Sequence, residues 1–498
     1  MNLFEEVFAH DLAAPAIHCG GREISYGQLR SATLRRAQAI TSLGIQRGDR
    51  VALLLHDSPE FVEAFIATCS LGAIAVPINM ALRLDEQCSI LHNCGATLAL
   101  AEPELCSTLR THAPEKLRSL RKIIPMEALP HVEAPETIEF AAPDDDDTAF
   151  ILYTSGSTGE PKGAMHRQAD ILYTNNTYCR EVLNLKPHDR LFSSSRLPFA
   201  YGLGNSFTFP LLNGATSILC REKPTPEVIA RIFVECRPTI FFGVPVVYNL
   251  LLEHHRSTEP LDCSSLRLCV SAGEALPAHL GEEWEEAFGV QLLDGIGSTE
   301  MLHMFMSNHE NDVRYGSSGK LLRGYQARLI DEIGKPIPDE VEGNLWIKGD
   351  SAALGYWEKP DETARTFVDE WVRTGDLYRR DARGFWYHMG RSDDCFKSSG
   401  QWVSPVEVEG ALLRHPRVAR AAVVEDFDAG GLPCACAFVV AQELESEPTA
   451  LEQELRECVG GVLPRFKQPR RYVFVSELPY TATGKIQRFK LRQSLRKQ

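Results

Sequence analysis

The chain has 498 residues with 44% apolar and 24% charged side chains, which is close to average globular usage and excludes extended disorder and fibrous architectures. Acidic residues outnumber basic ones by 67 to 52, giving a formal net charge of −15 at pH 7. This balance argues against nucleic acid or an anionic membrane surface as a general partner, because both are bound by a basic face.

The sequence offers no targeting or membrane signal. No run approaches the roughly 18 apolar residues that span a bilayer. The N-terminal MNLFEEVFAHDL has acids where a secretory signal has basic residues, and the C-terminal SLRKQ matches no retention or peroxisomal address. The 14 cysteines are scattered without a CxxC pair, which favours reduced, mostly buried thiols over disulfides or a zinc site. We therefore expect a cytoplasmic protein of two to four folding units.

The first part of the chain alternates strand-length apolar runs with helical patterns. Ser25 is a candidate N-cap for a helix through QLRSATLRRAQAITSLG that ends at Gly44, and Pro59 stands near the start of a second helix. The runs VALLLH, GAIAVPIN and ATLALAE lack a polar face. This pattern is typical of parallel strands that helices cover on both sides.

Four further apolar runs end in glycine-containing loops, and each is expected to be followed by a helix. They are AFILYT (149–154), TIFFGVP (239–245), LRLCVSAGE (266–274) and VQLLDGIGSTE (290–300). Ligands of open α/β sheets bind beyond the carboxyl ends of the strands, so we expect these four loops to converge on one site.

In the second part of the chain the regular alternation of apolar runs and helical patterns ends. Between about 320 and 390, turn signals separate short β-like runs, which predicts an antiparallel, β-rich subdomain. After a boundary near 390–394, helices at 405–415 and 450–460 alternate with strands at 418–425, 434–441 and 470–478. The predicted fold class is α/β, with a large N-terminal domain (1–392) of parallel sheets and helices plus the β-rich part. A small, mobile α+β domain (393–498) follows it.

The segment YTSGSTGEPKG (153–163) is the strongest chemical signal. Its glycines let backbone N–H groups approach an anion, its hydroxyls add donors, and Lys162 supplies charge, so it predicts a phosphate cradle. It is not a Walker A loop. The alternative is a flexible surface loop of small polar residues.

This segment resembles the phosphate loop of the acyl-adenylate-forming superfamily, which includes acyl-CoA ligases, standalone adenylation domains and firefly-type luciferases. Other superfamily motifs follow in the expected order across about residues 150–490. They are SAGE (271–274), GIGSTE (295–300), RTGD (373–376), GRSDD (390–394) and PYTATGK (479–485).

The resemblance implies ATP binding and catalysis by residues from all of these motifs. The implied ATP-binding residues are Thr154, Ser155, Gly156, Ser157, Thr158, Gly159, Lys162, Gly273, Glu274, Ala275, Asp294, Gly295, Ile296, Thr299, Asp376 and Arg391. Thr299, Glu300 and Lys485 are the implied catalytic residues, and Glu300 would also hold Mg²⁺. Ile296 departs from the family pattern, which often has an aromatic residue there to stack on adenine.

Segments 196–205, 298–305 and 399–407 look most like benzoate-type aryl-CoA ligases. By this analogy the acyl pocket is lined by Ala200, Tyr201, Gly297, His303 and Met304. A neutral His303 would form a hydrogen bond with an amino or hydroxyl group at the ortho position of the substrate ring. The alternative interpretation of Tyr201 and His303 is that they are ordinary core residues. These residues do not distinguish benzoate, anthranilate and hydroxybenzoates as the substrate.

The resemblance also implies a second half-reaction with a thiol. The C-terminal domain would swing about the hinge residue Asp393 and present Gly400, Gln401 and Trp402 to pantetheine. No carrier-domain signature follows the ligase region, which implies free CoA or a separate carrier protein as acceptor. The first hypothesis is therefore an ATP- and Mg²⁺-dependent aryl-CoA ligase, with a carrier-loading adenylation enzyme as the alternative.

A catalytically silent scaffold is disfavoured because Lys485, Glu300 and Asp376 are all present. Whether the chain forms a homodimer stays open.

Overall fold

The computed structural model describes residues 2–112, 117, 119–129, 135, 138, 140, 144, 146–155, 161–257, 260–398, 401–428, 430–442, 448–480 and 486–495. The chain divides into two compact units, Met1–Gln326 with Ile347–Val372, and Ala327–Trp346 with Arg373–Gln498. The domain boundary expected at residue 393 rests on the motif there and stays a prediction.

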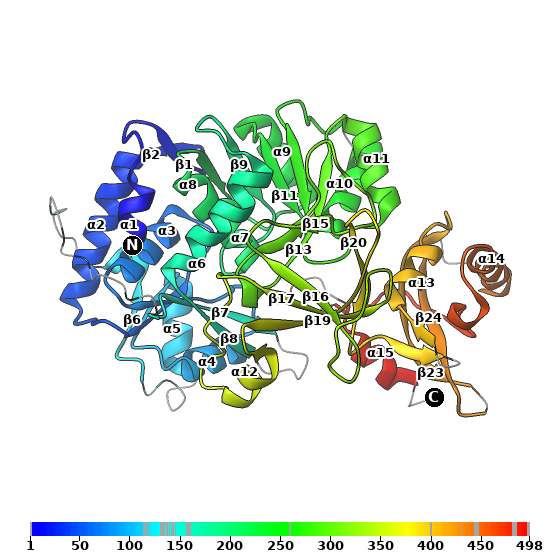
Figure 1. The fold of residues 1–498 in the computed structure, drawn as a ribbon. Coiled ribbons are helices and arrows are strands. Elements are labelled where there is room, and N and C mark those ends of the chain that lie inside the picture. Colours follow the sequence, from blue (N-terminus) through cyan, green and yellow to red (C-terminus); the bar gives the residue numbers. More distant parts are fainter. Residues whose placement is uncertain are drawn as a thin grey trace. The chain divides into compact units, whose positions relative to one another are not determined.

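A six-stranded sheet in the first unit has the order β6-β5-β3-β4-β7-β8, in which β7 and β8 are antiparallel and the other neighbours are parallel (Figure 1). Its strands are β3 (Arg50–Leu54), β4 (Ile74–Pro77), β5 (Leu98–Ala101), β6 (Lys122–Pro125), β7 (Phe150–Ser155) and β8 (Pro161–His166).

Helices cover both faces of this sheet, as the uniformly apolar runs predicted. On one face Val51 and Leu53 of β3 pack with α2 (Tyr26–Ser42) and α3 (Pro59–Ser70), together with α1 (Leu3–Val7). On the other face Ala52 and Leu54 pack with α4 (Leu84–Asn93) and α5 (Pro103–His112). The strand has no solvent-facing side, so it has no polar alternation.

The predicted helix starts are confirmed. Ser25 caps α2 in a capping box with Gln28, in which each side chain accepts from the other's backbone N–H. Pro59 is the first residue of α3, where its missing N–H costs no helical hydrogen bond. Gly44 follows α2 with a φ of +82°, a conformation that favours glycine at a helix end.

A second, nine-stranded sheet has the order β15-β14-β13-β12-β11-β9-β10-β1-β2. Its strands are β1 (Pro15–Cys19), β2 (Arg22–Ser25), β9 (Arg190–Ser193), β10 (Thr216–Leu219), β11 (Ile240–Gly243), β12 (Leu268–Ser271), β13 (Leu292–Gly297), β14 (Met304–Ser307) and β15 (Lys320–Leu321). The strands from β13 to β1 run parallel, and β14, β15 and β2 are antiparallel to their neighbours.

Three helices pack on one face of this sheet and bury its apolar side chains (Figure 1). They are α9 (Pro226–Cys236), α10 (Pro245–Ser257) and α11 (Ala278–Phe288). The remaining α-helices in the described part of the unit are α6 (Gln168–Thr174), α7 (Ala200–Leu203), α8 (Phe209–Leu212) and α12 (Pro360–Thr366). Two π-helices, Asn175–Leu183 and Gly204–Thr208, directly follow α6 and α7. None of the helices within the described ranges is both long and apolar enough to cross a membrane.

The structure corrects the expectation that a helix follows each of the four glycine loops. The run 149–154 is followed by the antiparallel strand β8, and the run 290–300 leads into a single 3₁₀ turn, Thr299–Met301, and then the antiparallel strand β14. The strand β7 also belongs to a different sheet from β11, β12 and β13. Strands β8 and β14 form by pairing with β7 and β13, and the periodicity of their own residues does not indicate this pairing.

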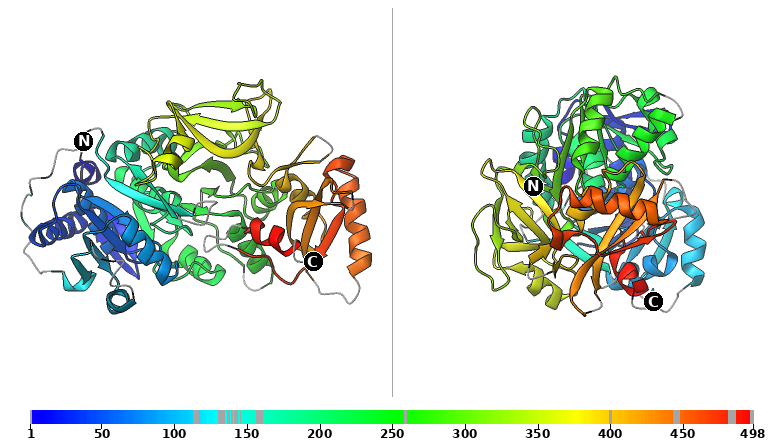
Figure 2. Two further views of the ribbon diagram at one scale, coloured as in Figure 1. Left: turned by 90° about the horizontal axis from the view of Figure 1, so that it is seen from below. Right: turned by 90° about the vertical axis from the view of Figure 1, so that its right-hand side faces the viewer.

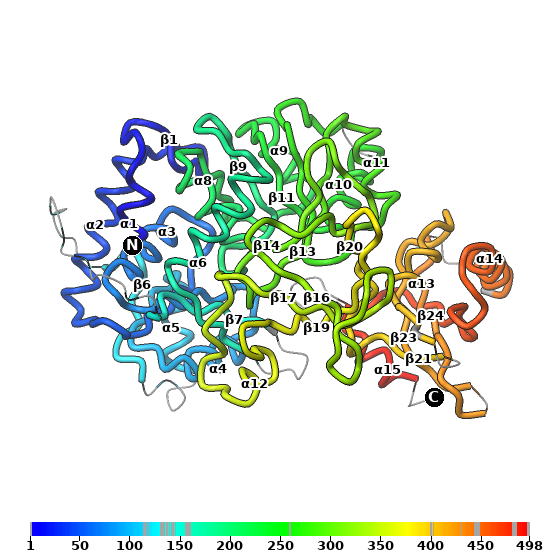
Figure 3. Tube along the Cα trace, viewed as in Figure 1, coloured from blue at the N-terminus to red at the C-terminus, as the bar shows by residue number. Residues whose placement is uncertain are grey.

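The β-rich part expected at 320–390 is a sheet in the order β16-β17-β19-β18, with β20 paired to β19, and β19 runs antiparallel to both β18 and β20. Figure 3 traces this part of the chain, with β16, β17, β19 and β20 labelled. Its strands are β16 (Gln326–Ile330), β17 (Gly343–Lys348), β18 (Phe367–Val368), β19 (Trp371–Arg380) and β20 (Trp386–Arg391).

The α+β arrangement expected for the C-terminal residues is confirmed. A three-stranded sheet, β23 (Val418–Phe427), β24 (Pro433–Ala441) and β25 (Arg471–Phe474), has α13 (Pro405–Leu412) and α14 (Pro448–Gly460) on one face. On its other face lies α15 (Arg488–Leu495), as Figure 2 shows. A short hairpin of β21 (Phe396–Ser398) and β22 (Gln401–Val403) precedes the sheet.

Candidate active site

The carboxylate of Glu300 lies in the 3₁₀ turn directly after β13. Its Oε1 accepts a hydrogen bond of 2.7 Å from the hydroxyl of Tyr356. The ammonium nitrogen of Lys162 lies 5.4 Å from the centre of the same tyrosine ring, within the range of a cation–π contact. Tyr356 thus holds the predicted metal-binding acid and contacts the predicted phosphate-binding lysine. Sequence reasoning did not find this tyrosine.

The two ends of the serine- and glycine-rich turn are paired strands. Thr154 of β7 pairs with Lys162 of β8 in the antiparallel register, and both side chains are half-buried. Gly156, Ser157, Thr158 and Gly159 lie outside the described residues, so their predicted contacts with phosphate stay predictions. The hairpin nevertheless fixes where the turn begins and ends.

The predicted adenine-pocket segments lie at one edge of the nine-stranded sheet. Strands β12 and β13 are parallel neighbours, with Ser271 opposite Asp294, so the loop that follows β12 and the end of β13 are adjacent. Gly273 and Glu274 are exposed, and Gly273 has a φ of +91°. Burial raises the pKa of the Asp294 carboxyl well above its usual range. Its predicted contact with the nucleotide stays a prediction.

Four further residues that were predicted to bind ATP differ in how far they are buried. Gly295 is buried, whereas Ile296, Ala275 and Thr299 are half-buried. A half-buried aliphatic side chain at 296 fits packing against a base face without aromatic stacking.

The predicted acyl pocket gathers around His303. Its ring lies 5.1 Å from the ring of Tyr178, 5.7 Å from that of Tyr201 and 4.6 Å from that of Phe209, measured between centroids. Burial lowers the pKa of His303 to about 3, so its imidazole is neutral at physiological pH. Ala200 and Met304, which were also predicted to line the acyl pocket, are buried. Sequence reasoning missed Tyr178 and Phe209.

Two glycines are required by the backbone and side chain of His303. A Cβ atom at Gly297 would lie 2.4 Å from the His303 carbonyl oxygen, and one at Gly204 would lie 2.5 Å from its ring carbon Cδ2. Real contacts of that length do not occur, so both positions exclude larger residues unless His303 moves. The hydroxyl of Tyr201 donates to the carbonyl of Val270 at 3.2 Å, which fixes its ring.

In the second unit, Asp376 and Arg391 face each other across β19 and β20. The Arg391 guanidinium donates to Asp376 Oδ1 at 3.0 Å, and His388 Nε2 lies 3.5 Å from the same oxygen. Burial alone would raise the pKa of Asp376, but the hydrogen bond from His388 and the charge of Arg391 outweigh it and lower that pKa. Asp376 is therefore an ionised acceptor, as binding of ribose hydroxyls requires.

The remaining predicted residues of the second unit lie around its turns. Asp393 is exposed in the turn after β20, and Gln401 and Trp402 belong to β22. Gly400 and Lys485 lie outside the described residues. The segment that holds Lys485 is flanked by a bridge between Tyr480 and Ile486.

Helix α15, which follows Lys485, is anchored by ion pairs. Arg488 donates to both carboxylate oxygens of Glu409 at 2.8 Å, and Arg492 donates to Asp394 at 3.1 Å. Nη2 of Arg488 makes both contacts with Glu409, and hydrogen bonds between charged groups are stronger than neutral ones. The helix that begins three residues after the predicted catalytic lysine is thus fixed to α13 and to Asp394, the neighbour of the predicted hinge residue.

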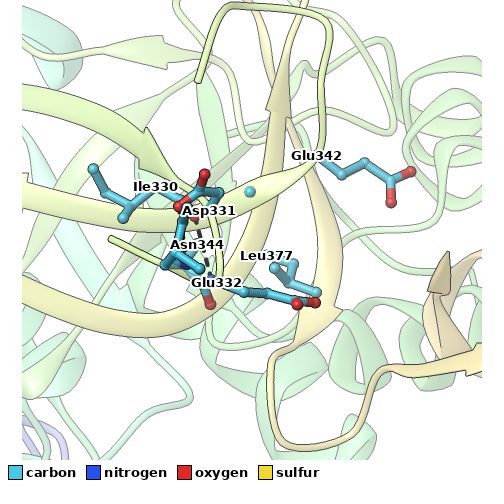
Figure 4. A pocket seen from close by; sticks show the side chains of 8 residues that line it. Ile330, Asp331, Glu332, Glu342, Asn344 and Leu377 are labelled. Carbon is cyan, nitrogen blue, oxygen red and sulfur yellow. Dashed lines mark hydrogen bonds between the residues drawn. The ribbon is translucent and has the colours of Figure 1, made fainter. Parts of the chain in front are cut away.

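A cavity of about 350 Å³ in the second unit is lined by acids (Figure 4). Asp331, Glu332 and Glu342 contribute to it beside Leu377, and burial raises the pKa of Glu342. Glu332 is paired with Lys397 at 2.6 Å, and none of the residues that line this cavity is a predicted site residue.

The surroundings of Glu300 fit its predicted role as a ligand of Mg²⁺. Within the described parts of the chain, no three His, Cys, Asp or Glu side chains are grouped as a metal site. Mg²⁺ at phosphate-transfer sites commonly takes one or two carboxylates, with phosphate oxygens and water completing its shell. A single carboxylate, Glu300, oriented by Tyr356 therefore suits Mg²⁺ bound together with a nucleotide.

Comparison with known proteins shows the family. Residues 4–357 match the model of the AMP-binding enzymes, and residues 407–485 match that of the AMP-binding enzyme C-terminal domain. The chain therefore belongs to the AMP-binding enzyme family, whose members form acyl-adenylates.

Within the family the similarity is to aryl-CoA ligases. The chain is 42% identical over 486 residues to a benzoate–CoA ligase of Thauera aromatica, covering 94% of this chain and 90% of that protein. The crystal structure of the anthranilate CoA ligase AuaEII in complex with anthranoyl-AMP matches with a TM-score of 0.93 and 37% identity, covering 99% and 97% of the two chains. A benzoate CoA ligase from Burkholderia xenovorans LB400 matches with a TM-score of 0.90 and 39% identity, covering 99% and 100%.

Proposed function

We propose that this protein activates benzoate, or an amino- or hydroxy-substituted benzoate, with ATP and Mg²⁺ and transfers the aryl group to CoA. The observation that carries the proposal is the near full-length similarity to benzoate and anthranilate CoA ligases. The enzyme is an acid–thiol ligase that uses ATP and CoA. The aromatic surroundings of His303 support a flat, largely apolar substrate.

In the first half-reaction a carboxylate oxygen of the aromatic acid attacks the α-phosphorus of ATP. The bond from that oxygen to phosphorus forms while the bond from phosphorus to the pyrophosphate oxygen breaks. Both reactants are anions, so the protein must neutralise charge and align them. The hydroxyl of Thr299 would donate to the α-phosphate, and the Lys485 ammonium would lie between the two anions.

The remaining residues hold the nucleotide. The ionised Asp376 would accept from the ribose hydroxyls, with Arg391 released to ribose or phosphate. Glu300, held by Tyr356, would carry Mg²⁺, which supplies positive charge to the phosphates when bound. The cradle around residues 154–162 would donate to the phosphate oxygens.

In the second half-reaction the CoA thiolate attacks the acyl carbon, and AMP leaves with the oxygen that joined it to the acyl group. Rotation about Asp393 would withdraw Lys485 and bring Gly400, Gln401 and Trp402 to the pantetheine arm. Asp393 is exposed in a turn, which suits a position that absorbs backbone rotation.

A test compares acids and acceptors in one assay. Purified protein with ATP, Mg²⁺ and CoA is offered benzoate, anthranilate, salicylate and 4-hydroxybenzoate, and kcat/KM is measured for release of AMP and formation of the aryl-CoA. We expect at least one of these acids to give both products in equal amounts. Pyrophosphate exchange without thioester from CoA, but with loading of a phosphopantetheine carrier, would favour the carrier-loading alternative.

A further inference from the structure

A buried histidine outside the predicted site residues contacts the Thr299–Met301 turn. His166 ends β8, and its side chain and that of Asp170 are both fully buried. The imidazole stacks on Phe150, with 5.3 Å between ring centres and 21° between planes. The ring is therefore held in one orientation by its neighbours in the hairpin.

Both ring nitrogens of His166 face oxygen acceptors. Nδ1 lies 2.9 Å from Asp170 Oδ2, and Nε2 lies 2.7 Å from the carbonyl oxygen of Thr299. Asp170 already accepts from the backbone N–H and the guanidinium of Arg167, at 3.0 and 2.8 Å. A carbonyl oxygen cannot donate, so Nε2 carries the hydrogen of the contact with Thr299.

The other carbonyls of the turn are held from elsewhere. The backbone N–H of Ala353 donates to the Glu300 carbonyl at 2.8 Å, and the Ser351 hydroxyl donates to the Met301 carbonyl at 2.9 Å. The Thr299 carbonyl accepts from the Leu302 N–H within the turn at 3.1 Å and, at the shorter distance of 2.7 Å, contacts His166 of the hairpin that also carries Lys162. Through this contact His166 ties the hairpin of the phosphate turn to the residue predicted to bind the α-phosphate.

We propose that His166 is a positioning residue for adenylation, which fixes Thr299 and Glu300 relative to the phosphate turn through its Nε2–H bond to the Thr299 carbonyl. This inference rests on the proposed function. Its effect should be confined to the half-reaction in which the phosphates of ATP are bound. Attack of a thiol on a finished aryl-adenylate does not need the phosphate turn to be aligned with Thr299 in this way.

Two substitutions separate the contacts of His166. In His166→Gln the side-chain amide nitrogen takes the place of Nε2 and keeps the donor to Thr299. In His166→Asn the amide nitrogen takes the place of Nδ1 and keeps the contact with Asp170, but the donor to Thr299 is lost. The two variants therefore differ in the hydrogen bond to the Thr299 carbonyl, whereas both lack the imidazole ring.

We expect His166→Asn to lower kcat for ATP–pyrophosphate exchange by about 10- to 100-fold, since misplacement by about 1 Å can cost on the order of 100-fold. His166→Gln should retain most of the exchange rate. Thioester formation from supplied aryl-adenylate and CoA should remain near the wild-type rate in both variants. Thermal unfolding of both variants reports any general loss of stability.

Equal exchange rates for the Gln and Asn variants would overturn the proposal, as would a proportional loss of both half-reactions. If both variants fail to fold, Arg167→Gln tests the same chain of contacts from its more exposed end. Selective loss of pyrophosphate exchange would then support the proposal, and unchanged exchange would overturn it. Failure of the wild type to adenylate any aromatic acid would instead refute the proposed function.

Discussion

The hydroxyl of Tyr356 donates to the carboxylate of Glu300 at 2.7 Å, across a sequence separation of 56 residues. The same tyrosine presents its ring to Lys162. A carboxylate that must hold a divalent ion beside phosphate gains from a fixed donor, because one of its oxygens is oriented before the ligand arrives. Tyr356 therefore prepares two predicted nucleotide-binding groups at once.

Removal of this hydroxyl should weaken adenylation more than stability. We expect Tyr356→Phe to lower ATP–pyrophosphate exchange by roughly 10-fold and to raise the Mg²⁺ concentration required for half-maximal rate, because outer contacts of this kind typically contribute 10- to 100-fold. The control is Tyr387→Phe, which removes a hydroxyl that donates to Asp381 at 3.1 Å in the second unit. An unchanged Mg²⁺ dependence in Tyr356→Phe would contradict this role.

Lys485 should matter for one half-reaction only. We expect Lys485→Ala to reduce pyrophosphate exchange by at least about 100-fold, since a charge positioned on the transition state contributes several kcal/mol. Thioester formation from supplied aryl-adenylate should be largely spared. Lys490→Ala, which alters an exposed lysine in α15, is the matched control. Equal loss of both half-reactions in Lys485→Ala would show that the lysine does not divide them.

The fit of His303 against Gly204 predicts a change in substrate choice. In Gly204→Ala the added Cβ would lie 2.5 Å from the His303 ring, so this ring, which belongs to the predicted acyl pocket, must shift. We expect kcat/KM for benzoate to fall by about 10-fold or more, with KM for ATP unchanged, because overpacking displaces neighbours. Gly410→Ala, where a Cβ meets nothing within 4 Å, is the control. An unaltered ranking of aromatic acids would contradict a pocket at His303.

The buried neutral state of His303 predicts acid sensitivity. Burial lowers its pKa to about 3 in the folded protein from an ordinary value of 6.5, so the unfolded chain binds the extra proton first as the pH falls. Above pH 6.5 His303 does not lower the free energy of unfolding. Between pH 6.5 and 3 it lowers that free energy progressively as the pH falls. At about 1.4 kcal/mol per pKa unit the loss reaches about 3 kcal/mol at pH 4.

Replacement by a side chain that does not titrate should remove this contribution. Denaturation midpoints of wild type and His303→Asn, measured from pH 7 to pH 4, should converge because only the wild type carries this penalty. Parallel midpoints across the range would show that His303 is protonated as easily in the folded protein as in the unfolded one.

The strands and helix caps were predictable because local physics determines them. Val51–Leu54 is apolar on both faces since helices cover both sides of β3, and Ser25 caps α2 with its own neighbour Gln28. The order of the superfamily motifs predicted the family, which the comparisons confirm. All fourteen cysteines are free, and each is buried or half-buried, as their spacing indicated.

The supporting residues of the site were not predictable in this way. His166 meets Thr299 across 133 residues, and Tyr356 reaches Glu300 because Ala164 pairs with Tyr356 in an isolated bridge. No periodicity or spacing encodes such long-range pairings. The hairpin β7–β8 was missed for a related reason, since PKGAMH becomes a strand by pairing with β7.

The most direct test of the account follows an oxygen atom. The protein is incubated with ATP, Mg²⁺, CoA and benzoate labelled with ¹⁸O in both carboxylate oxygens, and the nucleotide product is analysed by mass spectrometry. The account predicts AMP that carries one ¹⁸O, formed together with an equal amount of benzoyl-CoA. Unlabelled AMP, or ADP with label in inorganic phosphate, would contradict it.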